Sequence, residues 1–372
     1  MDTRAHPASW PLAAALDDLE SRIEDDVERE LWRQWRDFAR GACKQEVFVP
    51  RRPRPRPSER EWPRVPINAA LEDFEAMALQ AMGFCSQALA EASGKILNVR
   101  CNYGSPIMPM LFGVELFRMP EATDTLPACH PLPGGAEALR RLLDAGEPSL
   151  DQPYMNRVWE MGRRFKAIQA RYPKIGRHVH LYHPDFQGPL DILEMVVGSA
   201  LFMLLMDEPE LVHQALELIT RTYIRAMRRW QTIQPAREDG LTTHWGLVHP
   251  GAIMLRDDSA MNLSPAMFAE FVQPYDQRLL AEFGGGAIHA CGRVEHFVPF
   301  LPEMPGLTAF NMSQPRLNDM ATVWRNTVER GLLVIDADGQ AVHDALAAGQ
   351  RLHGRVHVGY PNAALALKLS RS

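Results

Sequence analysis

The sequence predicts an α/β fold, a (β/α)8 TIM barrel with an N-terminal helical extension. Short apolar segments alternate with longer amphipathic ones from residue 96 to residue 360, which is typical of a parallel sheet covered by helices. Polar residues follow many of these apolar segments, and barrel enzymes build their sites at the C-terminal ends of many strands. No GxGxxG or Walker sequence follows a predicted strand, so neither standard nucleotide-binding fold is indicated.

Each predicted element has a local signal. Ser264-Pro265 provides an N-cap followed by proline at the first helical position. Three glycines, residues 284–286, end the same helix and release the chain into the next strand. The predicted strands are residues 96–102, 179–183, 252–257, 287–291, 307–312, 332–335 and 356–360. The predicted helices are residues 151–171, 189–206, 209–232, 264–283, 317–329 and 340–349.

Residues 1–65 are predicted to form the extension and residues 66–372 the barrel domain. Within residues 15–42, Leu31, Trp35 and Phe38 recur on one face of a helix whose other face is charged. That apolar face needs a partner, which is either the barrel itself or a second subunit. Residues 50–57, PRRPRPRP, read as an extended linker or surface strap; a nucleic-acid or SH3-type ligand is the alternative.

Composition excludes several classes of protein. The net charge of −6 gives no reason to expect nucleic acid or an anionic membrane as a partner. The five cysteines contain no CxxC pair, which argues against a disulfide framework and for a reducing compartment. The N-terminus lacks a secretory apolar core, and the longest apolar run, residues 195–206, has 12 residues. A bilayer span needs about 20, so we expect a cytoplasmic protein.

The segment from His289 to Gly292 carries the clearest chemistry. Side chains two apart on a strand share a face, so His289 and Cys291 project together at the end of their strand. Imidazole and thiolate are suitable zinc ligands, and Gly292 lets the chain turn away sharply. The alternative is a half-buried histidine beside an inert cysteine.

Other polar residues at the predicted rim are candidates for catalysis. Asp257 and Asp258 could act as metal ligand, general base or a group that orients His289. Helix capping or an ion pair with Arg256 is the structural alternative.

Four further rim residues are predicted to bind substrate, together with Arg256. Arg256 and Arg293 could hold a carboxylate or sulfonate in bidentate fashion, or form rim salt bridges. Asp185 follows a predicted strand, and Asn311 could hydrogen-bond a substrate or cap a loop. Tyr103 follows the first barrel strand in the same way.

The stretch 252–293 resembles the uroporphyrinogen decarboxylase-like superfamily. Its pattern is Asp257-Asp258, the helix start at residues 263–265 and the His-x-Cys-Gly segment at residues 289–292. Weaker echoes, at residues 102–104 and 185–190, extend the resemblance to roughly residues 95–365. It is closest to the zinc-dependent corrinoid methyltransferase branch, and it implies a TIM barrel.

The resemblance also implies a metal site. Methyltransferases of this group carry His-x-Cys as two of three zinc ligands and a cysteine near the last strand as the third. No cysteine follows Cys291 here, so the third ligand must be another residue type. The candidates are Asp257, Asp258, His249, Glu295 and His357.

By resemblance, the protein would move a methyl group between a corrinoid on a partner protein and a small thiol or similar acceptor, using Zn²⁺. Trp245 and Phe112 could line an apolar mouth for the corrinoid, or simply pack in the core. One alternative is decarboxylation of a tetrapyrrole or related carboxylate, although residues 98–102 lack the arginine-rich motif of true decarboxylases. Another is a non-catalytic barrel that binds a corrinoid or a thiol. A homodimer is plausible because of the amphipathic N-terminal helix.

Overall fold

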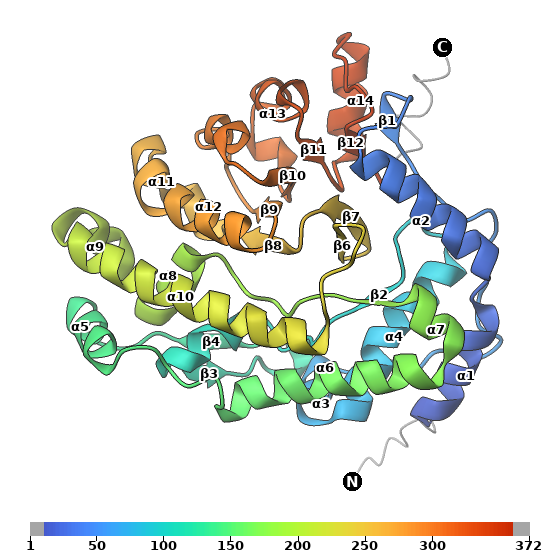
Figure 1. Ribbon diagram of the computed structural model, residues 1–372, viewed down its shortest axis with the longest axis horizontal. Helices are drawn as coiled ribbons and strands as arrows, with labels where there is room; N and C mark the ends of the chain where they lie inside the picture. Colours follow the sequence, from blue (N-terminus) through green and yellow to red (C-terminus); the bar gives the residue numbers. More distant parts are fainter. Residues whose placement is uncertain (1–10, 360–372) are drawn as a thin grey trace.

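The computed structural model describes residues 11–359 as an α/β protein with a mainly parallel sheet at its centre (Figure 1). Six parallel strands pair in the order β1-β12-β11-β10-β9-β8. Two more parallel strands, β2 and β5, pair with each other. The bounds are Val47–Phe48 (β1), Asn98–Val99 (β2), His180–Leu181 (β5), Ile253–Arg256 (β8), Gly286–Ala290 (β9), Leu307–Met312 (β10), Leu333–Val334 (β11) and Val356–His357 (β12).

Every predicted strand is present, and none is longer than its predicted range. Residue 360, in the last predicted strand, lies outside the described residues. Strand β1 pairs with β12, so the first and last of the eight parallel strands are neighbours. Across residues 11–359, no strand pairing joins β1 to β2 or β5 to β8. We call these breaks the first seam and the second seam. The α/β class is thus confirmed, whereas a closed barrel is not shown.

Helices cover the outer side of the strands. They include α6 (Pro153–Arg171), α8 (Pro189–Val197), α10 (Pro209–Ile233), α12 (Gln273–Glu282), α13 (Met320–Asn326) and α14 (Gly339–Ala347). The other helices and the small hairpin are α3 (Ile67–Glu72), α4 (Phe74–Ala90), α5 (Ala136–Ala145), α7 (Pro173–His178), β3 (Glu115–Phe117) and β4 (Ala128–His130).

Three predicted helices are each split into two. The helix predicted within residues 15–42 becomes α1 (Leu12–Arg22) and α2 (Asp25–Ala39). The apolar helix predicted over residues 189–206 breaks at Gly198, whose φ of 68° ends α8 before α9 (Ala200–Asp207) begins. The helix predicted over 264–283 becomes α11 (Pro265–Phe271) and α12, with a break at Val272. Among residues 11–359 no single helix is long and apolar enough to cross a membrane, although α8 and α9, bent by 111°, meet that test as a pair.

Both faces of the main sheet are buried, as is usual for parallel sheets. Ile253, Leu255 and Ile288 belong to the large apolar core under the outer helices. Met254 and Ala287 alternate with them and belong to a second apolar cluster on the inner face. Arg256 and His289 lie two residues after Met254 and Ala287, so their side chains share the inner face and can reach a site at the C-terminal rim.

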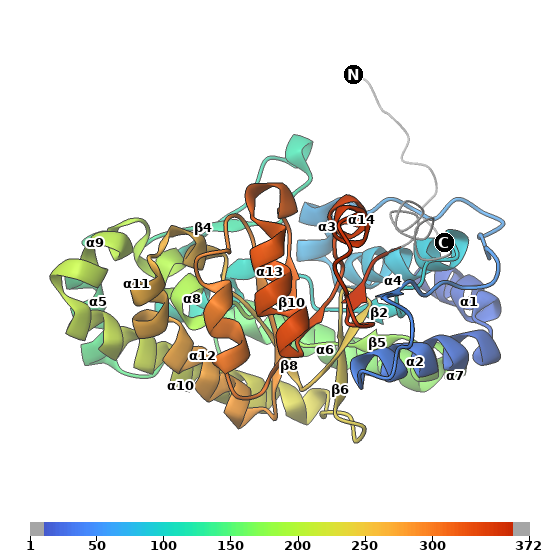
Figure 2. The same cartoon turned by 90° about the horizontal axis from the view of Figure 1, so that it is seen from above.

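The N-terminal segment is built into this core. Helix α2 (Asp25–Ala39) buries Leu31, Trp35 and Phe38 in the inner-face cluster, while α1 (Leu12–Arg22) packs on α4. The amphipathic face therefore docks on its own chain. Figure 2 shows α1, α2 and α7 together at one end of the molecule, opposite α5 and α9. Residues 50–57 form a strap, with Arg52 paired to Glu28 at 2.7 Å in the interior.

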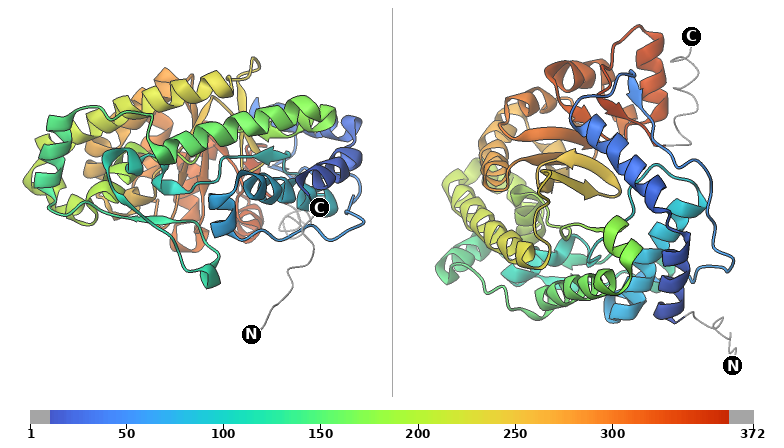
Figure 3. Two further views of the ribbon diagram at one scale, coloured as in Figure 1. Left: turned by 90° about the horizontal axis from the view of Figure 1, so that it is seen from below. Right: turned by 45° about the vertical axis from the view of Figure 1, so that its right-hand side comes forward.

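An unpredicted antiparallel hairpin fills the inner face. Strands β6 (Leu241–His244) and β7 (Leu247–Pro250) are joined by Trp245 and Gly246, whose φ angles are 52° and 79°. Such a two-residue turn normally carries Asn-Gly or Asp-Gly, so Trp-Gly gave no recognisable signal. The hairpin lies between the main sheet, where β7 contacts β9 and β10, and helix α2 (Figure 3, right). Its tip is tied down because the Gly246 carbonyl accepts a hydrogen bond from Ile96 N at 2.8 Å.

Candidate metal centre

Three neighbouring strands bring polar side chains together on the inner face. In the strand register, His289 on β9 lies beside Arg256 on β8 and beside Asn311 on β10. Each is the last or nearly the last residue of its strand. The parallel register therefore places their side chains at one rim.

Asp258, His289 and Cys291 form a cluster that could hold a metal ion. His289 Nε2 lies 3.6 Å from Asp258 Oδ1 and 3.4 Å from Cys291 Sγ, and the three ligand atoms all lie within 4.8 Å of one another. Ligand atoms around a tetrahedral zinc ion are separated by about 3.3–3.6 Å, given the usual bond lengths. The spacing and the N, S, O donor set fit such an ion.

Asn311 decides which nitrogen of His289 faces the cluster. Asn311 Nδ2 donates to the Ile335 carbonyl at 2.6 Å, which leaves Oδ1 to accept from His289 Nδ1 at 2.6 Å. The proton of the neutral imidazole therefore sits on Nδ1, and the Nε2 lone pair points toward Asp258 and Cys291. This is the usual arrangement of a metal-binding histidine. Asn311 is thus placed as a positioning residue; its predicted role in binding substrate stays a prediction.

Cys291 and Asp258 are also joined by a hydrogen bond. The backbone N–H of Cys291 donates to Asp258 Oδ1 at 2.8 Å, and the thiol lies 3.5 Å from Ser313 Oγ. Burial raises the pKa of the Cys291 thiol, the Ser313 hydrogen bond opposes the rise, and the Asp258 carboxylate adds to it. A metal ion would reverse this, since it binds the thiolate. The Asp258 side chain is 44% exposed, so an external ligand can reach the cluster.

Asp257, the other predicted acid, points away from the cluster. It is 1% exposed and packs so closely on Gly188 that a Cβ there would lie 1.9 Å from Asp257 Oδ1. Its carboxyl group interacts with that of Asp276 on α12. Burial, and then the neighbouring Asp276, raise the pKa of Asp257 well above its usual range. Its predicted catalytic role stays untested.

Asp185 and Arg256 form a second group beside the cluster. Asp185 lies 2.8 Å from Arg256 Nε and 3.0 Å from Arg100 Nη1. Although burial opposes ionisation, the Arg256 and Arg100 guanidinium groups lower the pKa of Asp185. Arg256 also stands over the ring of Trp245, at 5.3 Å from its centroid. The ring of Trp245 lies in turn 5.1 Å from that of His289, edge to face.

The remaining predicted site residues lie elsewhere. Tyr103 is fully buried and packs on Tyr154 in the outer core. The Arg293 side chain is 65% exposed and pairs with Glu295 at 2.6 Å. Of the five candidates for the third ligand, Asp258 is the one that the structure groups with His289 and Cys291 in residues 11–359.

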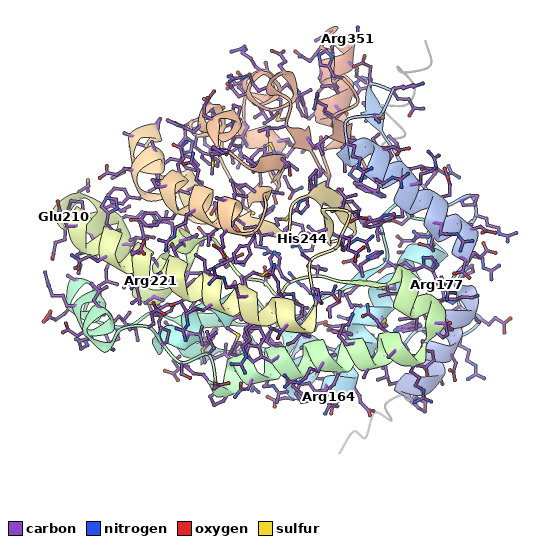
Figure 4. All side chains as sticks on the ribbon, viewed as in Figure 1. Arg164, Arg177, Glu210, Arg221, His244 and Arg351 are labelled. Atoms are coloured by element: carbon purple, nitrogen blue, oxygen red, sulfur yellow. The ribbon has the colours of Figure 1, made fainter. Side chains whose placement is uncertain are left out.

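A buried group of histidines lies under the site, and His249, one of the predicted candidates for the third ligand, belongs to it rather than to the cluster. His183 Nδ1 bonds the Pro184 carbonyl at 2.6 Å, and its Nε2 accepts from Met254 N at 3.1 Å. His244 Nδ1 bonds His249 Nε2 at 2.9 Å. Burial, followed by Arg256, lowers the pKa of His183 to about 3, and burial lowers that of His249 to about 4. Figure 4 places His244 near the centre of the molecule, with the labelled arginines at its periphery. These neutral rings support the hairpin rather than the cluster.

No family model and no curated protein sequence matches the chain. Among solved structures, the fold is similar to that of a methyltransferase from Methanosarcina mazei, with a TM-score of 0.59. The two chains are 16% identical, and the match covers 82% of this chain and 88% of that one. At this identity the likeness shows a shared fold.

Proposed function

We propose that the protein is a zinc-dependent methyltransferase that moves a methyl group from a corrinoid, carried by a partner protein, to a thiol. The observation that carries the proposal is the Asp258–His289–Cys291 cluster, with the His289 lone pair turned into it by Asn311. The structural neighbour is named a methyltransferase, which agrees with it. We further propose that the eight parallel strands form a (β/α)8 barrel opened at two seams, of the uroporphyrinogen decarboxylase-like type.

The three side chains have distinct tasks. His289 would hold the ion through Nε2, Cys291 through its thiolate and Asp258 through a carboxylate oxygen, and the partly exposed Asp258 leaves the cluster accessible to a thiol. A Zn²⁺ ion held there supplies Lewis acidity that keeps a bound thiol deprotonated and nucleophilic. The transfer forms the S–CH₃ bond and breaks the Co–CH₃ bond, with both electrons of that bond staying on cobalt. The thiol proton leaves to solvent.

The arginines do not form a clamp for several carboxylates, as decarboxylation of a polycarboxylate would need. Arg100 and Arg256 both engage Asp185, and Arg293 pairs with Glu295 at the surface. The arrangement therefore favours methyl transfer over the decarboxylase alternative.

The test is zinc content and methyl transfer from methylcobalamin to 2-mercaptoethanol, measured on wild type, His289→Ala and Cys291→Ala. We expect one zinc per chain in wild type and loss of both zinc and transfer in the two variants. His213→Ala and Cys129→Ala change the same residue types outside the cluster and should keep both. Zinc-free wild type after reconstitution with Zn²⁺, or zinc retained in both cluster variants, would refute the proposal.

A further inference from the structure

A large cavity lies at the first seam, where β1 and β2 are not hydrogen-bonded. Its volume is about 550 Å³, within the usual range for small-molecule sites. One wall is α4, with Phe84, and the segment that leads into β2, with Ile96; the other side reaches Asp336 after β11. Tyr182 and Trp245 line its inner end. The cavity lies on the β2 side of the seam and extends from α4 to Tyr182 and Trp245.

Trp245 connects this cavity to the metal cluster. Its ring lines the cavity and also contacts the His289 ring edge to face, with 5.1 Å between centroids. Its φ of 52° lies in the left-handed region, which is strained for a bulky residue. The neighbouring Gly246 packs closely on the segment before β2. A Cβ at this position would lie 2.7 Å from Lys95 Cβ and 2.9 Å from the Ile96 carbonyl oxygen, so the turn has little room to move. The hairpin therefore holds an indole ring at the border between cluster and cavity.

Three of the four charged side chains that line the cavity are in ion pairs, and the fourth, Glu91, is exposed to solvent. Lys95 Nζ lies 3.3 Å from Asp336 Oδ2, and Arg100 Nη1 lies 3.0 Å from Asp185 Oδ2. The Glu91 carboxylate accepts from Gln87 Nε2 at 2.8 Å. The aromatic and aliphatic side chains of Phe84, Ile96 and Trp245 share the remaining wall with the uncharged polar side chains of Gln80, Ser93, Asn98 and Asn102. An occupant therefore needs no net charge, and its apolar part packs on the aromatic side of the cavity.

We propose that this seam cavity holds the non-reacting body of the methyl acceptor, and that the acceptor is a thiol on an uncharged, largely apolar body at least as large as an aromatic ring. This rests on the proposed function, because the sulfur must reach the metal cluster. The body passes the edge of Trp245, which selects against acceptors that cannot pack on the indole. A two-carbon thiol would leave most of the 550 Å³ unfilled.

The test compares two alkyl thiols as acceptors from methylcobalamin, benzyl mercaptan and 2-mercaptoethanol. With zinc-loaded wild type, we expect kcat/KM to favour benzyl mercaptan by about 10- to 100-fold, as for burial of an aromatic ring. Ala88→Phe fills the cavity from α4 and should reduce this preference at least 5-fold, as should Trp245→Ala. Ala90→Phe, on the same helix but outside the cavity lining, should keep the wild-type preference.

A second measurement separates the cavity from the chemistry. Benzyl alcohol, which lacks the thiol, should bind metal-free wild type in saturation-transfer NMR and lose most of its signal with Ala88→Phe. Equal kcat/KM for the two thiols in an active, zinc-loaded enzyme would overturn this inference and leave the proposed function standing. Benzyl alcohol binding that is unaffected by Ala88→Phe would overturn it as well. If the protein holds no zinc and transfers no methyl group, both proposals fall together.

Discussion

Asp257 and Asp258 are neighbours in the chain, yet they belong to two different regions of the molecule. Asp258 faces the rim, where its carboxylate meets His289 and the backbone of Cys291. Asp257 is buried on the outer side of the strand, where its carboxyl group interacts with that of Asp276 on α12. Two residues of the same type thus differ in role: Asp258 is a candidate metal ligand at the rim, whereas Asp257 is one of two buried acids on the outer side of the strand.

Acidic residues on α8 also support the turn that carries Asp258. Asp191 on α8 accepts hydrogen bonds from the backbone N–H groups of Asp258, at 2.8 Å, and Ser259, at 2.9 Å. The Ser259 hydroxyl bonds Glu194. These contacts hold the turn that carries Asp258, so the acidic residues of α8 fix the position of the candidate metal ligand.

Replacement of the ligand itself should have the largest effect on the inner region. Asp258→Ala removes one of the three proposed ligands, and we expect zinc affinity to fall by more than about 100-fold. Asp257→Asn changes the neighbouring acid and should leave zinc affinity within a few fold of wild type. Competition with a chelator measures both. Equal losses in the two variants would contradict the separation of the two regions.

Loss of the Asn311 contact should have the next largest effect. Asn311→Ala frees His289 to rotate and to change tautomer, so zinc affinity should fall by about 10- to 100-fold. Asn311→Asp keeps an oxygen acceptor for His289 Nδ1 and should recover most of that affinity. Chelator competition again gives the numbers. If Asn311→Asp were as weak as Asn311→Ala, the orienting hydrogen bond would not be the cause.

A substitution beside Asp257 should change folding stability without changing zinc affinity. Gly188→Ala places a methyl group on the Asp257 carboxylate, and we expect a loss of about 1–3 kcal/mol in the free energy of unfolding. Urea denaturation of the metal-free protein should show it, while zinc affinity stays near the wild-type value. Gly240→Ala is a poor control because of its positive φ; Ala90→Ser, at a half-buried helix position, serves better.

The acid pair should make stability depend on pH. Burial raises the pKa of Asp276 from 3.8 to about 8, so the folded protein keeps a proton that the unfolded chain has released. The free energy of unfolding therefore falls as pH rises through this window. Asp276→Asn removes that term. Between pH 5 and pH 8, the stability of this variant relative to wild type should rise by about 2–4 kcal/mol, as measured by urea denaturation at both values. An unchanged difference would show that Asp276 is ionised.

Some of the candidate site could be predicted and some could not. His289 and Cys291 were found because the period of a strand puts them on one face. The choice of Asp258 over Asp257, Glu295 and the two histidines depends on the way β8 and β9 pair, and no local pattern reports that. Asn311 was noticed as a polar residue at a strand end, but its hydrogen bonds to His289 and Ile335 exist only after β9, β10 and β11 align.

The sequence by itself determined the alternation of strands and helices, the burial of both faces of the main sheet and the shared direction of His289 and Cys291. These follow from periodicity and from capping residues, which act within a few residues of one another. The tertiary structure alone decided the inserted hairpin, the two seams, the cavity beside Trp245 and the third residue of the cluster. Those features join segments far apart in the chain, and packing and strand register, rather than local preference, bring such segments together.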